Sequence, residues 1–133
     1  MLRRVALIIF YDNKKHILLQ ERKGMSKWGE EWAYFGGGIE EGESPEEAVV
    51  RETEEELNFK LDDFRYAGKV ARAKLKDDIF TDLFVFISPL NNKMREFTLG
   101  EGSAMRLFTI QEARKLKMVP GDEKVLDMLE KIL

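Results

Sequence analysis

The sequence contains no cysteine and a single histidine, His16. The absence of cysteine excludes disulfide bonds, thiolate nucleophiles and zinc sites built on sulfur, and one histidine cannot make a multi-histidine metal site. Any metal that the protein binds must therefore be held mainly by oxygen atoms.

Long apolar runs and an excess of positive charge are also missing. The apolar run VALIIFY near the N-terminus is too short to span a membrane and has no small-residue cleavage site of a signal peptide. The formal net charge is −3, which argues against binding to duplex nucleic acid or to an anionic membrane. We therefore expect a cytoplasmic protein with neither of these as a partner.

The composition that remains is that of an ordinary globular protein. The chain has 133 residues, of which 44% are hydrophobic and 35% are charged, with only three prolines. This length suits one hydrophobic core, and no repeat, linker or low-complexity segment interrupts it. We expect a single domain over residues 1–133, and a strand-rich domain of this size can form a homodimer.

Strand patterns occupy most of the first hundred residues. Apolar runs at 5–11 and 16–22 flank the turn DNKK and predict a hairpin, and runs at 66–75 and 79–87 predict a second one. The short apolar run WAYF stops at Gly36, Gly37 and Gly38. Residues 91–104 form a long polar connection, of a length that is often functional.

Two helices are expected near the C-terminus, after a short strand RLFTI. Thr109 and Glu112 form a capping box for a helix that runs to about Lys117. Asp122 is interpreted as the cap of a last helix. The apolar stripe of that helix consists of Val125, Leu126, Leu129 and Ile132.

The clearest helix is expected at residues 45–57. Ser44 is a typical N-cap, Pro45 suits the first helical position, and Glu47 completes a capping box. On a helical wheel Val49, Val50, Thr53 and Leu57 share the side that packs on a sheet. Glu47 and Glu54 face water, and the third side carries Ala48, Arg51, Glu52, Glu55 and Glu56.

The third side concentrates negative charge in an unfavourable place. Like charges spaced i, i+3 and i+4 destabilise a helix by about 0.2–0.5 kcal/mol per pair, and carboxylates near the C-terminus oppose the helix dipole. A divalent cation reverses this penalty, because oxygen ligands then share one positive charge. The alternative is a solvated acidic face with no ligand.

Residues 37–59, GGIEEGESPEEAVVRETEEELNF, resemble the Nudix box, G-x5-E-x7-R-E-U-x-E-E-x-G-U, where U is a bulky apolar residue. Gly37, Glu43, Arg51, Glu52, Glu55 and Glu56 all match in register. Thr53 replaces the aliphatic residue, and Asn58 replaces the glycine that ends the helix; asparagine also tolerates the left-handed conformation. The resemblance implies an α+β fold, the Nudix α/β/α sandwich with a mixed β-sheet and the Nudix loop-helix-loop.

The resemblance also implies metal-dependent chemistry. By position, Glu52, Glu55 and Glu56 would bind Mg²⁺ or Mn²⁺, together with the carbonyl of Gly37. Glu43 and Arg51 would tie the loop to the helix and orient Glu52. The metal would activate water for attack on a pyrophosphate bond of a small nucleotide substrate.

Two glutamates are candidates for the general base, Glu52 and Glu101. Glu101 lies in the polar connection and resembles the downstream glutamate that often completes the metal site. Glu96 in the same connection is an alternative. We favour Glu101 because Gly100 and Gly102 flank it and allow the loop to close.

Substrate contacts are less specific in the sequence. Arg22 and Lys23 end a strand, where a cation can meet phosphates, and Trp28 and Trp32 can stack on a base or complete a core. Asp122 lies in MVPGD, which faintly resembles the purine-reading segment of nucleotide-sanitising Nudix enzymes. Arg72 and Lys74 are interpreted as surface charges.

A pyrophosphohydrolase of nucleoside triphosphates or modified nucleotides is therefore expected. A pyrophosphatase of ADP-ribose or nucleotide sugars is the alternative substrate class. A nucleotide-binding module without turnover would be expected to have lost a box glutamate, and none is missing. An interaction domain with a purely structural acidic face remains a third reading, which predicts no effect of chelation.

Overall fold

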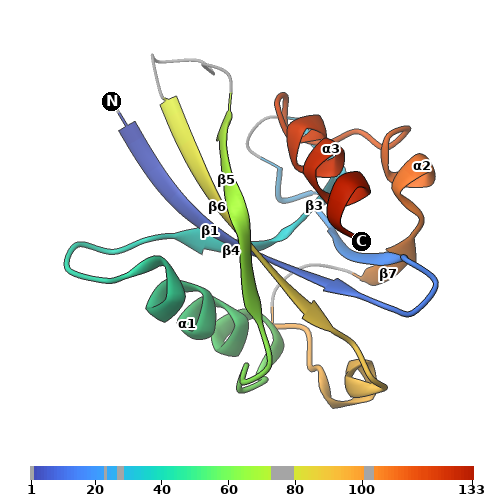
Figure 1. Ribbon diagram of the computed structural model, residues 1–133, viewed down its shortest axis with the longest axis horizontal. Coiled ribbons are helices and arrows are strands. Elements are labelled where there is room, and N and C mark those ends of the chain that lie inside the picture. The colour runs from blue at the N-terminus through green and yellow to red at the C-terminus, as the bar shows by residue number, and fades with distance from the viewer. Residues whose placement is uncertain (1, 23, 27–28, 73–79, 101–103) are drawn as a thin grey trace.

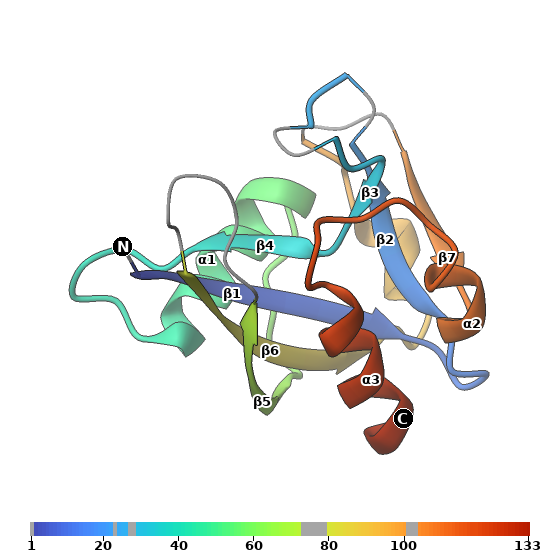
Figure 2. The same ribbon diagram turned by 90° about the horizontal axis from the view of Figure 1, so that it is seen from above.

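The computed structural model describes residues 2–22, 24–26, 29–72, 80–100 and 104–133. A mixed seven-stranded sheet lies between α1 (Pro45–Leu57) on one face and α2 (Ile110–Ala113) with α3 (Glu123–Ile132) on the other (Figures 1 and 2). The layers confirm the predicted α+β sandwich.

The strands pair in the order β3-β2-β1-β6-β5, with β4 added to β1 and β7 added to β2. β1 runs parallel to β6, and every other recorded pairing is antiparallel. The strand bounds are β1 Leu2–Tyr11, β2 Ile17–Glu21, β3 Trp32–Ala33, β4 Phe35–Gly38, β5 Arg65–Arg72, β6 Phe80–Pro89 and β7 Met105–Phe108.

β1 is apolar on both faces because both faces are covered. Val5, Leu7 and Ile9 pack into the core beneath α3, while the alternate residues, among them Ile8 and Phe10, pack into the core beneath α1. Side chains alternate along a strand, so a continuous apolar run is what a central strand requires. β1 thereby joins the two cores.

Both predicted hairpins are present within about three residues of their expected bounds, although the turn of the second lies outside the described residues. The apolar run WAYF stops at the three glycines, but the strand continues through them. Gly36, Gly37 and Gly38 belong to β4 and pair with β1. A Cβ atom at Gly36 would overlap the carbonyl of Ala6, so glycine permits this close approach.

α1 has the predicted bounds and caps. The hydroxyl of Ser44 accepts a hydrogen bond from the amide of Glu47, and the side chain of Glu47 accepts one from the amide of Ser44. Asn58 ends the helix in the left-handed conformation, with φ 49° and ψ 40°, as its place in the box predicts. Thr53 is fully buried and donates to the carbonyl of Val49.

The C-terminal third differs from expectation in three details. The capping box of Thr109 and Glu112 is present, but α2 ends at Ala113 rather than near Lys117. Asp122 makes no capping hydrogen bond with its side chain. The stripe of α3 buries Val125, Leu126 and Leu129, while Ile132 is 39% exposed.

In the polar connection, residues Lys93–Glu96 form a short 3-10 helix.

Among the described residues, none of the helices has the length and apolar character needed to cross a membrane.

Candidate active site on the glutamate helix

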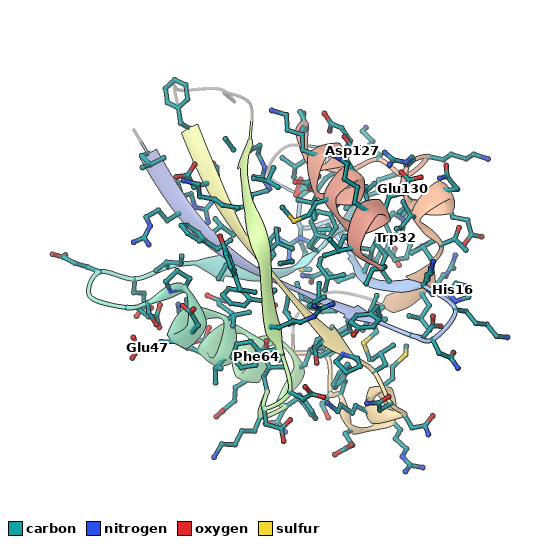
Figure 3. The ribbon with its side chains drawn as sticks, viewed as in Figure 1. His16, Trp32, Glu47, Phe64, Asp127 and Glu130 are labelled. Carbon is teal, nitrogen blue, oxygen red and sulfur yellow. The ribbon has the colours of Figure 1, made fainter. Side chains whose placement is uncertain are left out.

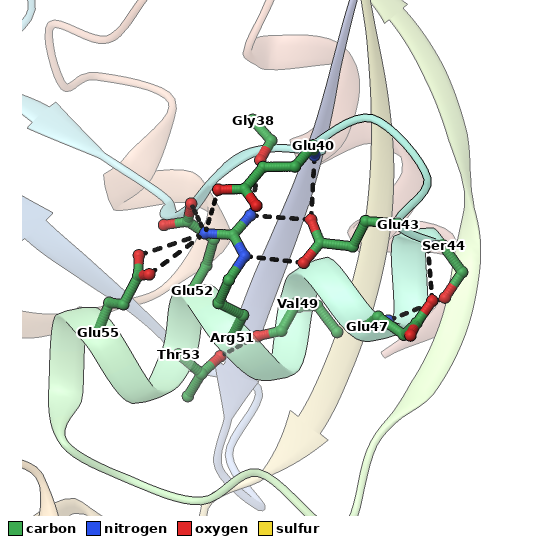
Figure 4. Close-up of polar contacts among 10 residues, drawn as sticks. All are labelled: Gly38, Glu40, Glu43, Ser44, Glu47, Val49, Arg51, Glu52, Thr53 and Glu55. Atoms are coloured by element: carbon green, nitrogen blue, oxygen red, sulfur yellow. Dashed lines mark hydrogen bonds and ion pairs between the residues drawn. The ribbon is translucent and has the colours of Figure 1, made fainter.

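Arg51 is the hub of the polar contacts on α1 (Figure 4). Its Nε donates to Oε2 of Glu43 at 2.8 Å and its Nη2 donates to Oε1 of Glu43 at 2.9 Å. The guanidinium therefore binds this carboxylate in a bidentate manner. Nη2 also donates to the carbonyl of Gly38. The bonds from Arg51, with a further one from the amide of Glu40, lower the pKa of Glu43 to about 2. The loop before α1 is therefore fastened to the helix by a strong charge-assisted fork.

Glu52 is held between Arg51 and the glycines of β4. Nη1 of Arg51 donates to Oε1 of Glu52 at 2.9 Å, and the side chain of Glu52 is only 15% exposed. A Cβ atom at Gly37 would overlap the Glu52 carboxylate, so the missing side chain at Gly37 makes the space that this carboxylate fills. Burial raises the pKa of Glu52, despite the opposing effect of Arg51.

Glu56 lies one turn further along and also faces β4. Its Oε2 accepts a hydrogen bond of 2.9 Å from the amide of Gly36. Burial raises the pKa of Glu56 to about 8, with the negative charge of Glu52 adding to the effect and the Gly36 amide opposing it. Glu52 and Glu56 are therefore two largely buried carboxylates on adjacent turns, and the negative charge of Glu52 disfavours ionisation of Glu56.

Glu55 completes the predicted set but is more exposed. Its side chain is 58% exposed, and both its oxygens lie 3.3–3.4 Å from Nη1 of Arg51, the atom that also contacts Glu52. Glu52 and Glu55 thus converge on one cationic nitrogen. Glu43, Glu52 and Glu55 therefore all meet Arg51, whereas Glu56 lies on the next turn of the helix against Gly36.

The donor chemistry of this face fits a hard divalent cation. The groups are the carboxylate oxygens of Glu52, Glu55 and Glu56, which Mg²⁺ and Mn²⁺ prefer, and burial disfavours the charged forms of Glu52 and Glu56 and raises the pKa of both. Within the described part of the chain, no three acidic or histidine side chains already converge as a metal cage. Arg51 contributes the positive charge between Glu52 and Glu55 in this arrangement.

A cavity of about 230 Å³ opens beside Glu56, and we call it the Glu56 cavity. Gly36, Gly37 and Glu56 line one part of it, and Arg22 lines it as well. The positive charge of Arg22 counteracts the raised pKa of Glu56. Arg22 therefore borders the same cavity as Glu56, and its role as a phosphate contact stays a prediction.

A larger cavity of about 560 Å³ lies elsewhere, where β1 and β6 end. Tyr11, Pro89 and Leu107 are part of its lining, and none of the box glutamates borders it. Its one carboxylate, Asp12, is engaged by the side chain and amide of His16. Size alone would favour this larger cavity as the active site. We instead assign the site to the glutamate helix by its chemistry.

Arg72 is not the surface charge that the sequence predicts. Its side chain is 10% exposed, and its Nη2 donates to Oδ1 of Asp122 at 2.8 Å. Asp122 is 3% exposed at its side chain, so this carboxylate forms a buried ion pair instead of capping α3. Burial raises the pKa of Asp122 to about 6, although Arg72 opposes the shift. No local sequence signal links these two residues, which are 50 positions apart.

Trp32 is not among the residues that line the Glu56 cavity, although its neighbour Ala33 is, and it packs against the core beneath α3 (Figure 3). Its ring packs edge-on against Phe108, with centroids 4.9 Å apart, and the guanidinium of Arg106 lies 5.5 Å from its centroid. The indole ring of Trp32 is therefore already in contact with the side chains of Arg106 and Phe108. Trp28, the other candidate for stacking, is outside the described residues.

Comparison with known proteins identifies the family. The NUDIX domain model matches residues 1–129. The chain belongs to the Nudix family. Over 92 residues, which are 69% of this chain and 81% of the relative, it is 26% identical to an 8-oxo-dGTP diphosphatase of Proteus vulgaris. These findings support a Nudix pyrophosphohydrolase, and Nudix enzymes act on nucleoside diphosphate-linked substrates, generally with divalent metals.

Two further Nudix proteins show the extent of the similarity. A nucleoside triphosphate pyrophosphatase/Nudix hydrolase fusion protein of Bifidobacterium longum is 34% identical over 74 residues, and the chain spans 15% of its length. The MutT protein of Methanosarcina mazei Go1 superposes with a TM-score of 0.75 at 21% identity, covering 98% of this chain and 91% of the other. At that identity the superposition shows a shared Nudix fold.

Glu101, the favoured candidate for the downstream glutamate of a Nudix site, lies outside the described residues. The residue before it is placed, because the amide of Gly100 donates to the carbonyl of Glu56 at 2.8 Å. The described chain thus reaches the end of α1 one residue before Glu101. The alternative, Glu96, lines a separate depression with Asn58 and Phe59 beyond the end of the helix.

Proposed function

We propose that this chain hydrolyses the pyrophosphate bond of a nucleoside triphosphate or a modified nucleotide with Mg²⁺ or Mn²⁺. The observation that carries the proposal is the carboxylate face of α1, where Glu52 and Glu56 lie half-buried against the glycines of β4. A helix gains no stability from such a face alone. A cation bridging the face and a pyrophosphate accounts for it.

In this proposal Glu52, Glu55, Glu56 and the carbonyl of Gly37 hold the divalent cation. When bound, such an ion neutralises phosphate oxygens and acidifies the attacking water. Arg51 keeps the carboxylate of Glu52 at the glycine strand, and Glu43 fixes the guanidinium of Arg51 through the fork. Arg22 contacts the substrate phosphates from the rim of the Glu56 cavity.

Glu52 and Glu101 remain the two candidates for the general base. Glu52 is the candidate that the structure describes, with its carboxylate held at the glycine strand by Arg51. Glu101 follows directly on the segment that Gly100 fastens to α1. The two are separated by comparing the pH dependence of kcat for Glu52→Gln and Glu101→Gln. We expect the decrease of kcat at low pH, which reflects protonation of the base, to disappear only in the variant that lacks the base.

A single nucleotide is the favoured substrate. The Glu56 cavity of about 230 Å³ is smaller than the roughly 300–1,000 Å³ of pockets that enclose drug-sized ligands. It therefore suits one base, with the phosphates lying outside along α1. The relative named 8-oxo-dGTP diphosphatase points to the same class. ADP-ribose and nucleotide sugars, with a second bulky group, are the alternative.

Product analysis tests the proposal. Purified protein is incubated with nucleoside triphosphates, oxidised purine triphosphates, ADP-ribose and dinucleoside polyphosphates, with Mg²⁺, Mn²⁺ or EDTA. We expect a nucleoside monophosphate and pyrophosphate from a triphosphate, whereas two monophosphate products from ADP-ribose would establish the alternative. Absence of turnover on every substrate would contradict an enzymatic role and favour a nucleotide-binding module.

Variants on the same helix make the test specific. Glu55→Gln removes a proposed metal ligand, and we expect a loss of kcat of at least about 100-fold, as for removal of an important charge-stabilising group. Glu54→Gln is the matched control, because Glu54 is exposed and faces water. Equal activity of the two variants would place the chemistry away from this face.

A further inference from the structure

Arg3 lies near the N-terminal end of β1, where this strand runs beside the end of the glycine strand β4 (Figure 2). The register pairs Leu7 with Gly36 and Val5 with Gly38. Because side chains alternate along a strand, Arg3, Val5 and Leu7 point to the same face of the sheet. All three line the Glu56 cavity. The cavity therefore extends along β1 from Leu7 to Arg3.

The guanidinium of Arg3 lies over the last residue of the glycine strand. A Cβ atom added to Gly38 would be 3.9 Å from Nη2 of Arg3. The carbonyl of the same glycine accepts a hydrogen bond of 2.9 Å from Nη2 of Arg51. Two guanidinium groups therefore flank Gly38, that of Arg51 from α1 and that of Arg3 from the cavity.

Arg3 is not committed to a carboxylate, unlike two other arginines near the site. Arg51 contacts the glutamates of the box, and Arg72 is paired with Asp122. Among the residues that the structure describes, the exposed side chain of Arg3 forms no ion pair and no hydrogen bond. The N–H donors of its guanidinium are therefore available to a ligand at the cavity.

An available guanidinium at this place suits a phosphate group. Its planar fork of donors matches two phosphate oxygens, and such charge-assisted hydrogen bonds are stronger than neutral ones. The phosphate chain of a triphosphate carries more negative charge than a single divalent cation neutralises, and the carboxylates of α1 add to that charge. A further cation beside the glycine strand offsets this repulsion.

The order of the glycines indicates which phosphate Arg3 meets. In the proposed function the base occupies the Glu56 cavity and the phosphates lie outside it. Phosphates that leave the cavity along β4 pass Gly36 and Gly37, which line it, before they reach Gly38, which is not part of its lining. Arg3 at that end therefore meets the phosphate farthest from the base.

We propose that Arg3 is a specificity-determining residue that binds the terminal phosphate of a nucleoside triphosphate and favours triphosphates over nucleotides that end in a sugar. This inference rests on the proposed function. ADP-ribose and nucleotide sugars carry a neutral sugar where a triphosphate carries its terminal phosphate, and a neutral acceptor gains less from a guanidinium. Arg3 thus selects between the two substrate classes that the Nudix box leaves open.

The first part of the test measures binding of inorganic pyrophosphate, which has no base, by calorimetry in Mg²⁺. We expect Arg3→Gln to weaken this binding at least about 10-fold, as for loss of a charge-assisted hydrogen bond, and Arg3→Lys to restore part of the affinity. Arg4→Gln is the matched control, because the guanidinium of Arg4 lies 5.2 Å from the ring centroid of Phe84 and is not part of the cavity lining.

The second part compares substrates that share a base. kcat/KM is measured for ATP with ADP-ribose and for UTP with UDP-glucose, and a sugar compound that is not hydrolysed is assayed as a competitive inhibitor. We expect Arg3→Gln to lower kcat/KM for the triphosphate at least about 10-fold, mainly through KM, and to change the paired sugar nucleotide by less than about 3-fold. Arg4→Gln should change neither.

The outcomes separate this inference from the proposed function. Pyrophosphate that binds wild type and Arg3→Gln equally, or that is weakened equally by Arg3→Gln and Arg4→Gln, contradicts the inference alone. Equal losses for a triphosphate and its paired sugar nucleotide contradict the selection between the two classes. A wild type that hydrolyses no nucleotide contradicts the proposed function, and the pyrophosphate titration still decides whether Arg3 binds phosphate.

Discussion

At the scale of single residues, the site depends on Gly37 having no side chain. The carboxylate of Glu52 lies where a Cβ atom of residue 37 would be, and Arg51 holds it there. The glycine of the motif is therefore explained by the space that a neighbouring carboxylate occupies. In the same strand, the amide of Gly36 donates a hydrogen bond to the carboxylate of Glu56.

Gly37→Ala should impair catalysis more than folding. The added methyl group displaces the flexible end of Glu52, which can move, so we expect kcat to fall at least about 10-fold while the free energy of unfolding changes by less than about 2 kcal/mol. Gly38→Ala is the matched control, because the nearest atom to its Cβ is Nη2 of Arg3 at 3.9 Å. Equal effects of the two variants in steady-state kinetics and urea unfolding would contradict this explanation.

Glu56 predicts a pH dependence of stability in metal-free protein. Its pKa is raised from 4.5 to about 8 by burial, so between these values the folded state retains a proton that the unfolded state has lost. The free energy of unfolding should therefore fall as pH rises from 6 to 8, by at most about 1.4 kcal/mol per pH unit. Urea unfolding in EDTA at pH 6, 7 and 8 measures this slope.

Glu56→Gln should flatten that slope, whereas Glu54→Gln, on the water side of α1, should preserve it. Asp122, whose pKa is raised to about 6, has lost most of its proton by the middle of this range and contributes little above pH 7. An identical slope in wild type and Glu56→Gln would show that Glu56 is not the titrating group.

At the scale of elements, α1 was predictable because its signals are local. The N-cap at Ser44, the proline at the first helical position and the left-handed Asn58 all act within a few residues, and the structure has each of them. α2 was predicted too long because a capping box specifies where a helix begins and leaves its end open. The chain leaves the helix after Ala113.

Asn58 offers a direct test of the end of α1. Its φ of 49° is a conformation that costs an ordinary residue about 1–2 kcal/mol, and glycine adopts it freely. We expect Asn58→Ala to lower the free energy of unfolding by about 1 kcal/mol and Asn58→Gly to be neutral within about 0.5 kcal/mol. Chemical denaturation of both variants checks this, and equal destabilisation would mean that the backbone angle is not the cause.

At the scale of the whole molecule, the sequence does not reveal which distant segments meet. The parallel pairing of β1 with β6 and the pairing of β2 with β7 join segments far apart in the chain, with no local signal. The ion pair of Arg72 and Asp122 arises in the same way, so both residues were misread from their immediate neighbours. The motif locates the carboxylates, and only the fold places Arg72, paired with Asp122, at the cavity that Glu56 lines.

The central claim is that the carboxylate face of α1 binds a divalent cation that turnover requires. The most direct measurement titrates Mn²⁺ into metal-free wild type, Glu56→Gln and Glu54→Gln by electron paramagnetic resonance, alongside nucleotide hydrolysis at each Mn²⁺ concentration. We expect wild type and Glu54→Gln to bind and hydrolyse in parallel, and Glu56→Gln to lose at least about 10-fold in both. Hydrolysis that persists in EDTA, or Mn²⁺ binding that is unchanged in Glu56→Gln, would contradict the claim.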